Sequence, residues 1–179
     1  MDSPWLLLIY TVPAKPTRLR AFIWREVKKI GAVYLHDGVC ALPERPETLE
    51  AVKAIASRVR EFEGETTVVT GATFDAARGE GVIAAFKTAR SGEYAEVTRE
   101  AERLLEHIAR ETNHRDFTFA ELEELEEDLA KLTRWSNQVR ARDYFPDAAT
   151  TASIEQLLAQ CASALADFLE AAAARDASV

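Results

Sequence analysis

The chain has 179 residues, of which 47% are hydrophobic and 29% are charged, and it carries a formal net charge of −8. This composition is typical of a folded globular protein and excludes a disordered one. We expect no window with the roughly 20 apolar residues of a membrane helix, and the apolar run 5–12 is too short for a signal peptide. Two cysteines, Cys40 and Cys161, form neither a disulfide framework nor a zinc-finger spacing. A cytoplasmic protein with no membrane partner is therefore predicted.

Charge is unevenly divided along the chain. Residues 1–74 carry 10 Lys and Arg against 9 Asp and Glu, so the remaining residues carry 12 against 21. The first part has a net charge of +1 and can approach a polyanion such as DNA, whereas the second part, at −9, would be repelled by one.

The first 75 residues alternate between strand-like and helix-like patterns. In chain order we predict a strand at 5–12, a helix at 17–30, strands at 32–35 and 39–42, a helix from 46 to about 63, and a strand at 66–70. Thr17 is expected to cap the first helix and Gly31 to follow it, while Pro46 opens the second helix and Gly64 ends it. Asp37-Gly38 between two apolar runs predicts a hairpin. This β-α-β-β-α-β order is that of ferredoxin-like domains.

After residue 75 the pattern is helical throughout. Apolar residues recur every three or four positions from Ile83 to Ile108, from Leu122 to Val139 and from Ile154 to Phe168. A turn is expected at 113–116, and the pairs Thr118 with Glu121 and Ser153 with Gln156 resemble capping boxes. Three such helices joined by short loops predict an antiparallel bundle. We therefore expect an α+β protein with a ferredoxin-like module at 1–75 and a three-helix bundle at 76–179.

A basic stripe lies on the first predicted helix. Arg18, Arg25 and Lys29 fall within about 20° of one line on a helical wheel, with Lys28 beside them and Trp24 at the edge. Such a stripe can neutralise phosphates and, with its aromatic neighbour, bind a nucleic acid. A solvated face opposite an apolar one is the structural alternative.

A second basic cluster, with Arg134-Trp135, Arg140, Arg142 and Asp143, ends a helix that begins with acidic residues. Complementarity with the helix dipole explains this order of charges but not the tryptophan among the arginines. Because the planar guanidinium makes paired hydrogen bonds, arginine suits tetrahedral oxyanions such as sulfate, phosphate or chromate.

Arg90 occupies a core position of the first bundle helix and needs a partner there. Asp143 or Glu93 could supply it, and a structural ion pair is a more common outcome than a ligand site. His107 and His114 lack metal-ligand spacing with each other or with a cysteine, and no catalytic motif is present. The sequence therefore predicts no metal, no cofactor and no catalytic residue.

Several stretches together resemble the N-terminal region of ChrB, the chromate-resistance regulator family. They are Trp5–Pro13, Arg20–Ala32, Asp37-Gly38-Val39, Leu42-Pro43, Ala89-Arg90, Glu93-Tyr94, Phe119–Asp128, Arg134-Trp135 and Arg142–Phe145. The hairpin half is also similar to the central module of PaaX-type repressors. Full-length ChrB is longer and carries a separate C-terminal domain. The resemblance implies DNA binding by the basic module and oxyanion sensing by arginines, and it points to Arg20, Trp24, Arg25, Lys28, Arg90, Arg134, Arg142 and Asp143.

Our leading hypothesis is a chromate- or oxyanion-responsive transcriptional regulator or accessory factor that acts as a homodimer. The predicted DNA-binding residues are Arg18, Arg20, Trp24, Arg25, Lys28 and Lys29, and the predicted oxyanion-binding residues are Arg90, Arg134, Arg140 and Arg142. One alternative is a chromate-detoxifying enzyme or an oxyanion-binding accessory protein. Another is a protein-interaction module that does not bind DNA.

Overall fold

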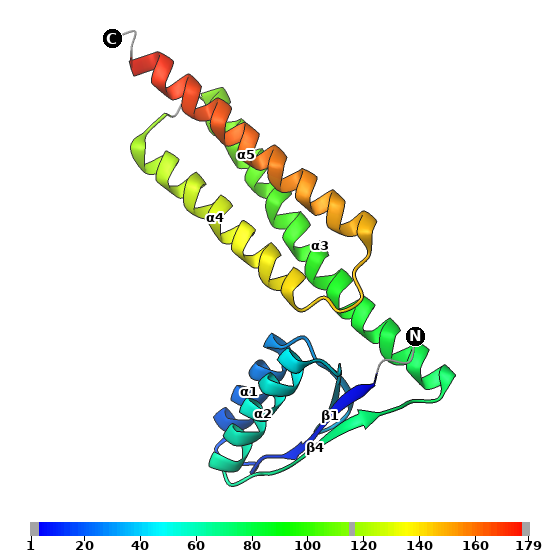
Figure 1. Ribbon diagram of the computed structural model, residues 1–179. Helices are drawn as coiled ribbons and strands as arrows, with labels where there is room; N and C mark the ends of the chain where they lie inside the picture. The colour runs from blue at the N-terminus through cyan, green and yellow to red at the C-terminus, as the bar shows by residue number, and fades with distance from the viewer. Residues whose placement is uncertain (1–3, 115–116, 177–179) are drawn as a thin grey trace. The chain divides into compact units, whose positions relative to one another are not determined.

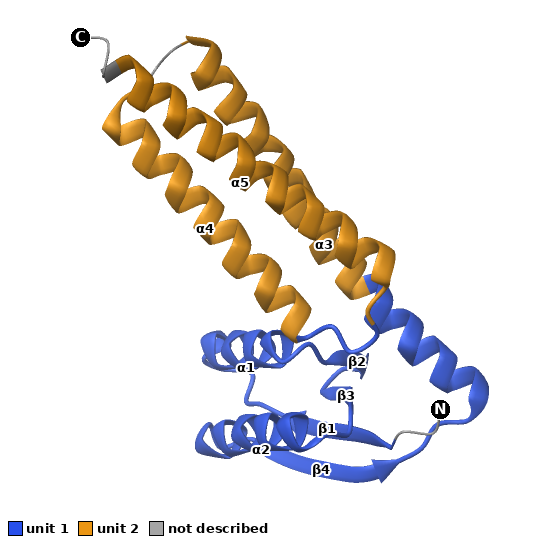
Figure 2. Ribbon diagram, turned by 45° about the horizontal axis from the view of Figure 1, so that its top comes forward, with its two compact units in different colours: residues 1–88, 142–145 blue, residues 89–141, 146–179 orange. Residues whose placement is uncertain are grey.

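The computed structural model describes residues 4–114 and 117–176. Its class is α+β, as predicted, with a four-stranded antiparallel sheet and two helices followed by three long helices (Figure 1). The chain forms two compact units, unit 1 with residues 1–88 and 142–145 and unit 2 with residues 89–141 and 146–179 (Figure 2). The predicted domain division after residue 75 stays a prediction.

Unit 1 contains a ferredoxin-like sheet. Its elements are β1 (Trp5–Thr11), α1 (Thr17–Lys29), β2 (Val33–His36), β3 (Val39–Pro43), α2 (Pro46–Glu61) and β4 (Glu65–Ala72). The strand order is β2-β3-β1-β4, and each neighbouring pair is antiparallel. In the central strand, Leu8 lies opposite Cys40 of β3 on one side and Val68 of β4 on the other. This is the split βαβ arrangement that the order of elements predicted.

Proline and glycine residues lie at the ends of α1 and α2, although the N-cap residue of α1 differs from the one predicted. Thr17 is the first residue of α1 and not its N-cap, because the extended Pro16 holds that position. Gly31 follows the C-cap with φ +75°, as expected. Pro46 opens α2, where the Thr48 hydroxyl accepts a hydrogen bond from the Arg45 backbone N–H at 2.9 Å.

Gly64 lies just after the end of α2, as the sequence predicts, but it is not the residue with a positive φ. Glu63 takes the left-handed conformation there, with φ +58°. A Cβ at Gly64 would collide with the carbonyl oxygen of Thr11 and with the Val59 side chain. The glycine is therefore needed for close backbone approach and not for its own φ.

Both faces of the sheet are packed. Side chains alternate along β1, so Leu6 and Leu8 face α1 and α2, which lie side by side on one face (Figures 1 and 2). Trp5 and Leu7 face the other way and join a second cluster around Phe86. The first cluster is the larger, and its buried members from the helices are Ile23, Val27, Val52, Ile55, Ala56 and Val59.

The second face is covered by residues from beyond the sheet. Residues 76–88 of α3 (Ala76–His114) belong to unit 1. The Phe86 ring centroid lies 6.0 Å from that of Trp5, 5.9 Å from that of Tyr144 and 5.4 Å from that of Phe145. Tyr144 also donates a hydrogen bond to the carbonyl oxygen of Ile30 at 2.7 Å. The segment 142–145, late in the chain, therefore completes the first unit.

Replacing Gly31 by alanine is expected to destabilise unit 1 by at least about 1 kcal/mol, since left-handed backbone disfavours any Cβ. The added Cβ would also lie 2.8 Å from the Arg142 Cβ. Gly81→Ala is the matched control, because its Cβ would meet open space inside α3, and it should stabilise by about 0.5–1 kcal/mol. Urea unfolding of the two variants measures both changes, and equal effects would contradict the expectation.

Unit 2 is an antiparallel bundle of three helices, the later part of α3 with α4 (Phe119–Ala141) and α5 (Ala148–Asp176) (Figure 1). The three predicted seams meet in its core, except that the start of the first seam, with Phe86, packs in unit 1 instead. Its main cluster contains Ala101, Leu104 and Ile108 from α3, Leu125 and Leu132 from α4, and Cys161, Leu165 and Phe168 from α5. A smaller cluster combines Tyr94, Val97, Val139 and Ile154.

One of the two predicted caps in the bundle is present. The Thr118 hydroxyl accepts a hydrogen bond from the backbone N–H of Glu121 at 3.3 Å, at the start of α4. The cap predicted at Ser153 is wrong, because Asp147 caps α5 by accepting hydrogen bonds from the backbone N–H and hydroxyl of Thr150. The turn predicted at 113–116 lies partly outside the described residues, and His114 is the last residue of α3.

Helix α5 is long and apolar enough to cross a membrane by length and composition, with a mean hydropathy of 1.3 in its most apolar window. The sequence expectation of no such window is thus not met. Much of this hydropathy comes from alanine, whereas Ile154, Leu165 and Phe168 are buried in the bundle. Packing against α3 and α4 accounts for these buried residues of α5, whereas only 17% of the apolar window is buried.

Candidate functional site

All six predicted DNA-binding residues lie on α1 with their side chains exposed. Trp24 has 52% of its surface exposed, a large fraction for a tryptophan. Ile23 and Val27, which are fully buried, anchor the opposite side of the helix to the sheet. The exposed side is polar and basic, and Trp24 is its one large aromatic residue.

The exposed side has two parts. Arg18, Arg25 and Lys29 follow one line along the helix, and we call these three residues the basic ridge. At about 100° per residue, Arg20 and Trp24 lie more than about 90° around the axis from this line. The helical wheel places Trp24 at the edge of the ridge, and the family resemblance adds Arg20 to the predicted residues.

Lys28 lies between the two parts and contacts the aromatic one. Its ammonium nitrogen is 5.9 Å from the centroid of the Trp24 ring, which is within cation–π range. In the ridge, the Lys29 ammonium pairs with the Glu26 carboxylate at 2.6 Å, and both groups remain partly exposed. This pair is a weak, screened interaction that a phosphate can replace.

Arg20 and Trp24 form one wall of a groove of about 1090 Å³ between α1 and the β2–β3 hairpin. The other lining residues are Tyr10, Val12, Thr17, Ala21, Tyr34, Leu35, His36, Asp37 and Gly38. The groove is open and mixed in character, with aromatic, cationic and anionic side chains around it. It can accommodate a planar or polar group beside the helix.

Two tyrosines in this groove were not predicted. The hydroxyl groups of Tyr10 and Tyr34 are 2.7 Å apart and form a hydrogen bond. Burial raises the pKa of both phenols, so both stay neutral at physiological pH. Tyr10 continues the even-numbered, helix-facing side of β1, and that alternation is the sequence signal that could have identified it.

Arg90 is 3% exposed, and its guanidinium lies 3.2 Å from the Glu93 carboxylate one helical turn away. Of the two partners considered from sequence, Glu93 is therefore present. Asp143 belongs to unit 1 and Arg90 to unit 2, so their pairing stays a prediction. Within unit 1, an Asp143 carboxylate oxygen accepts a hydrogen bond from the backbone N–H of Phe145 at 3.2 Å.

The other predicted oxyanion-binding arginines have different surroundings. Arg134 and Arg140 are exposed on α4, and Arg140 pairs with Glu155 of α5. Arg142 is half-buried in unit 1 beside Gly31. A groove of about 370 Å³ in unit 2 brings Arg103 and Lys131 together instead, and its other described lining residues are Glu100, Leu104, His107, Asp128, Leu132 and Trp135.

Both cysteines are expected to be unreactive in the folded protein. Burial raises the pKa of the Cys40 thiol to about 12 and also raises the pKa of Cys161. Each thiol donates to a carbonyl oxygen, Cys40 to Leu8 at 3.7 Å and Cys161 to Ala101 at 3.4 Å. Because the thiolate is the nucleophile, a disulfide reagent at pH 8 should label neither residue until guanidinium is added. Rapid labelling of the native chain would contradict this and favour thiol-based reduction of chromate.

The comparison with known proteins covers residues of both units. Residues 20–177 match the family model described as "Protein ChrB, N-terminal". The chain belongs to the ChrB N-terminal family. The resemblance found in the sequence is confirmed.

"Protein ChrB" of Cupriavidus metallidurans is 30% identical over 95 residues, which are 53% of this chain and 29% of that protein. The chain thus spans well under half of this ChrB relative. The ChrB family match begins inside α1 and extends through α5, so it includes most of unit 1 and the whole described bundle.

Proposed function

We propose that this ChrB-family chain is a transcriptional regulator of chromate resistance that binds DNA through the exposed face of α1. On this proposal it acts in the cytoplasm as a homodimer, and chromate or a related oxyanion is its effector. A dimer would present two copies of α1 to the two halves of an operator.

The observation that carries the proposal is the exposed Trp24 with the Lys28 ammonium beside its ring, next to the basic ridge. Phosphate contacts supply most of the affinity of a protein for DNA, and a ridge of cations along one helix can follow the phosphate backbone. A single exposed aromatic side chain is common on protein surfaces, but one that stands among cations can also stack against a base or a sugar of a bound nucleic acid. A base or a sugar would cover it.

The net negative charge of the chain is expected to limit its affinity for DNA. Because the whole chain carries −8, we expect DNA to contact mainly the positive face of α1 and the number of phosphate contacts to be small. The affinity should therefore be modest even at low salt, and its logarithm should fall only gently as the logarithm of the salt concentration rises.

Arg90 is our preferred effector residue. Its guanidinium is buried beside a carboxylate that is itself 27% exposed, so a tetrahedral dianion could compete with Glu93 for it. When a dianion replaces the Glu93 carboxylate at Arg90, the local charge around α3 changes. The bundle then differs electrostatically between its effector-free and effector-bound states.

Fluorescence anisotropy with DNA from upstream of the protein's own gene tests the proposal. Binding is expected at about 50 mM salt, is expected to weaken as salt rises, and is expected to change with chromate but not with equimolar sulfate. An absence of binding at low salt, both with and without chromate, would rule out the proposal.

A further inference from the structure

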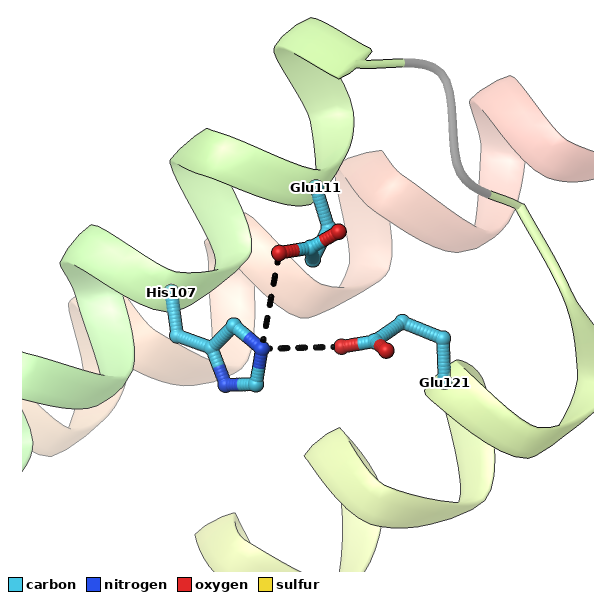
Figure 3. Close-up of side chains that lie close together, drawn as sticks. All are labelled: His107, Glu111 and Glu121. Atoms are coloured by element: carbon cyan, nitrogen blue, oxygen red, sulfur yellow. Dashed lines mark ion pairs between the residues drawn. The ribbon is translucent and has the colours of Figure 1, made fainter.

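Three potential metal-ligating side chains meet at one end of the bundle (Figure 3). His107 and Glu111 lie one turn apart on α3, and Glu121 lies in the first turn of α4. The Nε2 atom of His107 is 2.9 Å from Oε1 of Glu121 and 3.6 Å from Oε1 of Glu111. One donor atom from each residue lies within 4.8 Å of the other two.

The helices position these groups for a common ligand. The spacing of four residues places His107 and Glu111 on one face of α3. Packing of α3 against α4 in the bundle core brings Glu121 to the same face. The three side chains are 14–23% exposed, so solvent screens their charges only in part.

The Glu121 carboxylate has an oxygen atom that is available to a further ligand. Its Oε1 atom is buried and, among the described residues, has no hydrogen-bond donor, although His107 Nε2 is only 2.9 Å away. A histidine nitrogen and a carboxylate oxygen at this separation form an ion pair when the imidazole is protonated, and they can bind one cation together when it is neutral. The exposed Arg110 guanidinium lies 3.2 Å from Glu111 and gives this carboxylate a second, weaker partner.

We propose that His107, Glu111 and Glu121 bind a divalent first-row transition-metal ion, with zinc as the reference ion. An imidazole with two carboxylates suits zinc, manganese or iron, whereas calcium and magnesium prefer oxygen donors alone. Tetrahedral ligands at about 2.0–2.1 Å from zinc are about 3.3 Å apart, and the two histidine–carboxylate distances of 2.9 and 3.6 Å lie on either side of that value.

This site is independent of the proposed DNA binding, since it lies wholly in unit 2. Its ion would tie α3 to α4 directly, beside the loop that joins them. Three protein ligands leave at least one coordination position for water or an anion.

Equilibrium dialysis of the full chain against zinc chloride, with metal analysis, tests the site. We expect about one zinc ion per chain. His107→Gln and Glu121→Gln are each expected to weaken binding by at least about 100-fold, because loss of a direct ligand exceeds the roughly 10–100-fold effect of losing a residue that only hydrogen-bonds to a ligand. His114→Gln and Glu106→Gln, both exposed on α3, are matched controls that should bind like the wild type.

Cobalt provides a second measurement that needs no variant. The wild type with Co²⁺ is expected to show visible d–d absorption that excess zinc removes. Far-UV circular dichroism confirms that the variants keep their helices. A wild type that takes up neither ion, or a folded His107→Gln that binds zinc normally, would overturn the proposal and would indicate a protonated His107 between two carboxylates instead.

Discussion

Replacement of both Arg25 and Lys28 by glutamate is expected to abolish DNA binding at moderate salt, with an affinity loss of at least about 100-fold. The two substitutions remove one cation from the basic ridge and the cation beside Trp24, and they place two anions on the same face. The dependence of the affinity on salt should become shallower by about one unit of slope for each lost phosphate contact. Anisotropy titrations at several salt concentrations measure both quantities.

The matched control reverses two exposed cations on the other helix of unit 1, Lys53→Glu with Arg58→Glu. Each reversal changes the charge by −2, so both double variants carry −12 instead of −8. The α2 variant should retain most of the affinity. If both variants lose binding equally, net charge and not the α1 face governs the interaction.

Phe86→Ala is expected to destabilise unit 1 by about 3–5 kcal/mol, the usual cost of deleting a buried aromatic ring. Phe86 is 1% exposed and lies against the rings of Trp5, Tyr144 and Phe145. Its loss opens a cavity against the second face of the sheet, where α3 covers it. Hydrogen exchange of peptides from β1 and β4 should become faster by two to three orders of magnitude.

Phe119→Ala is the control, because 74% of this phenylalanine in α4 is exposed and its removal should change stability by less than about 0.5 kcal/mol. Exchange in α5 should be nearly unchanged by either substitution. If Phe86→Ala accelerates exchange in the bundle and leaves the sheet protected, residues 76–88 do not stabilise unit 1 as described.

The local residue pattern was sufficient to predict the helices and strands and to identify the exposed basic residues. Alternation in β1, three- and four-residue spacing in the helices, and the Asp37-Gly38 turn depend only on the geometry of each element. The order of these elements then restricted the sheet to few topologies. Because a helix needs one apolar face, the exposure of the basic ridge followed once Ile23 and Val27 were assigned to the core.

Cap details were less predictable, since several nearby residues can satisfy the same backbone group. Pro16 is the N-cap residue of α1 without a side-chain capping bond, and Asp147 caps α5, whereas Thr17 and Ser153 had been expected. Gly64 was predicted only to end α2, whereas the structure shows that Glu63 has the positive φ and that the nearby carbonyl of Thr11 requires a glycine at position 64. That requirement depends on β1, more than fifty residues earlier, and has no local signature.

By itself, the sequence determined the fold class, the family and the cationic character of α1, because each depends on residues close together along the chain. Only the tertiary structure decided that Phe86 and Tyr144 cover the second face of the sheet, that Tyr10 bonds to Tyr34, and that Glu121 joins His107 and Glu111. These groups come from different elements. Their approach is set by strand register and helix packing, which a list of residue spacings does not contain.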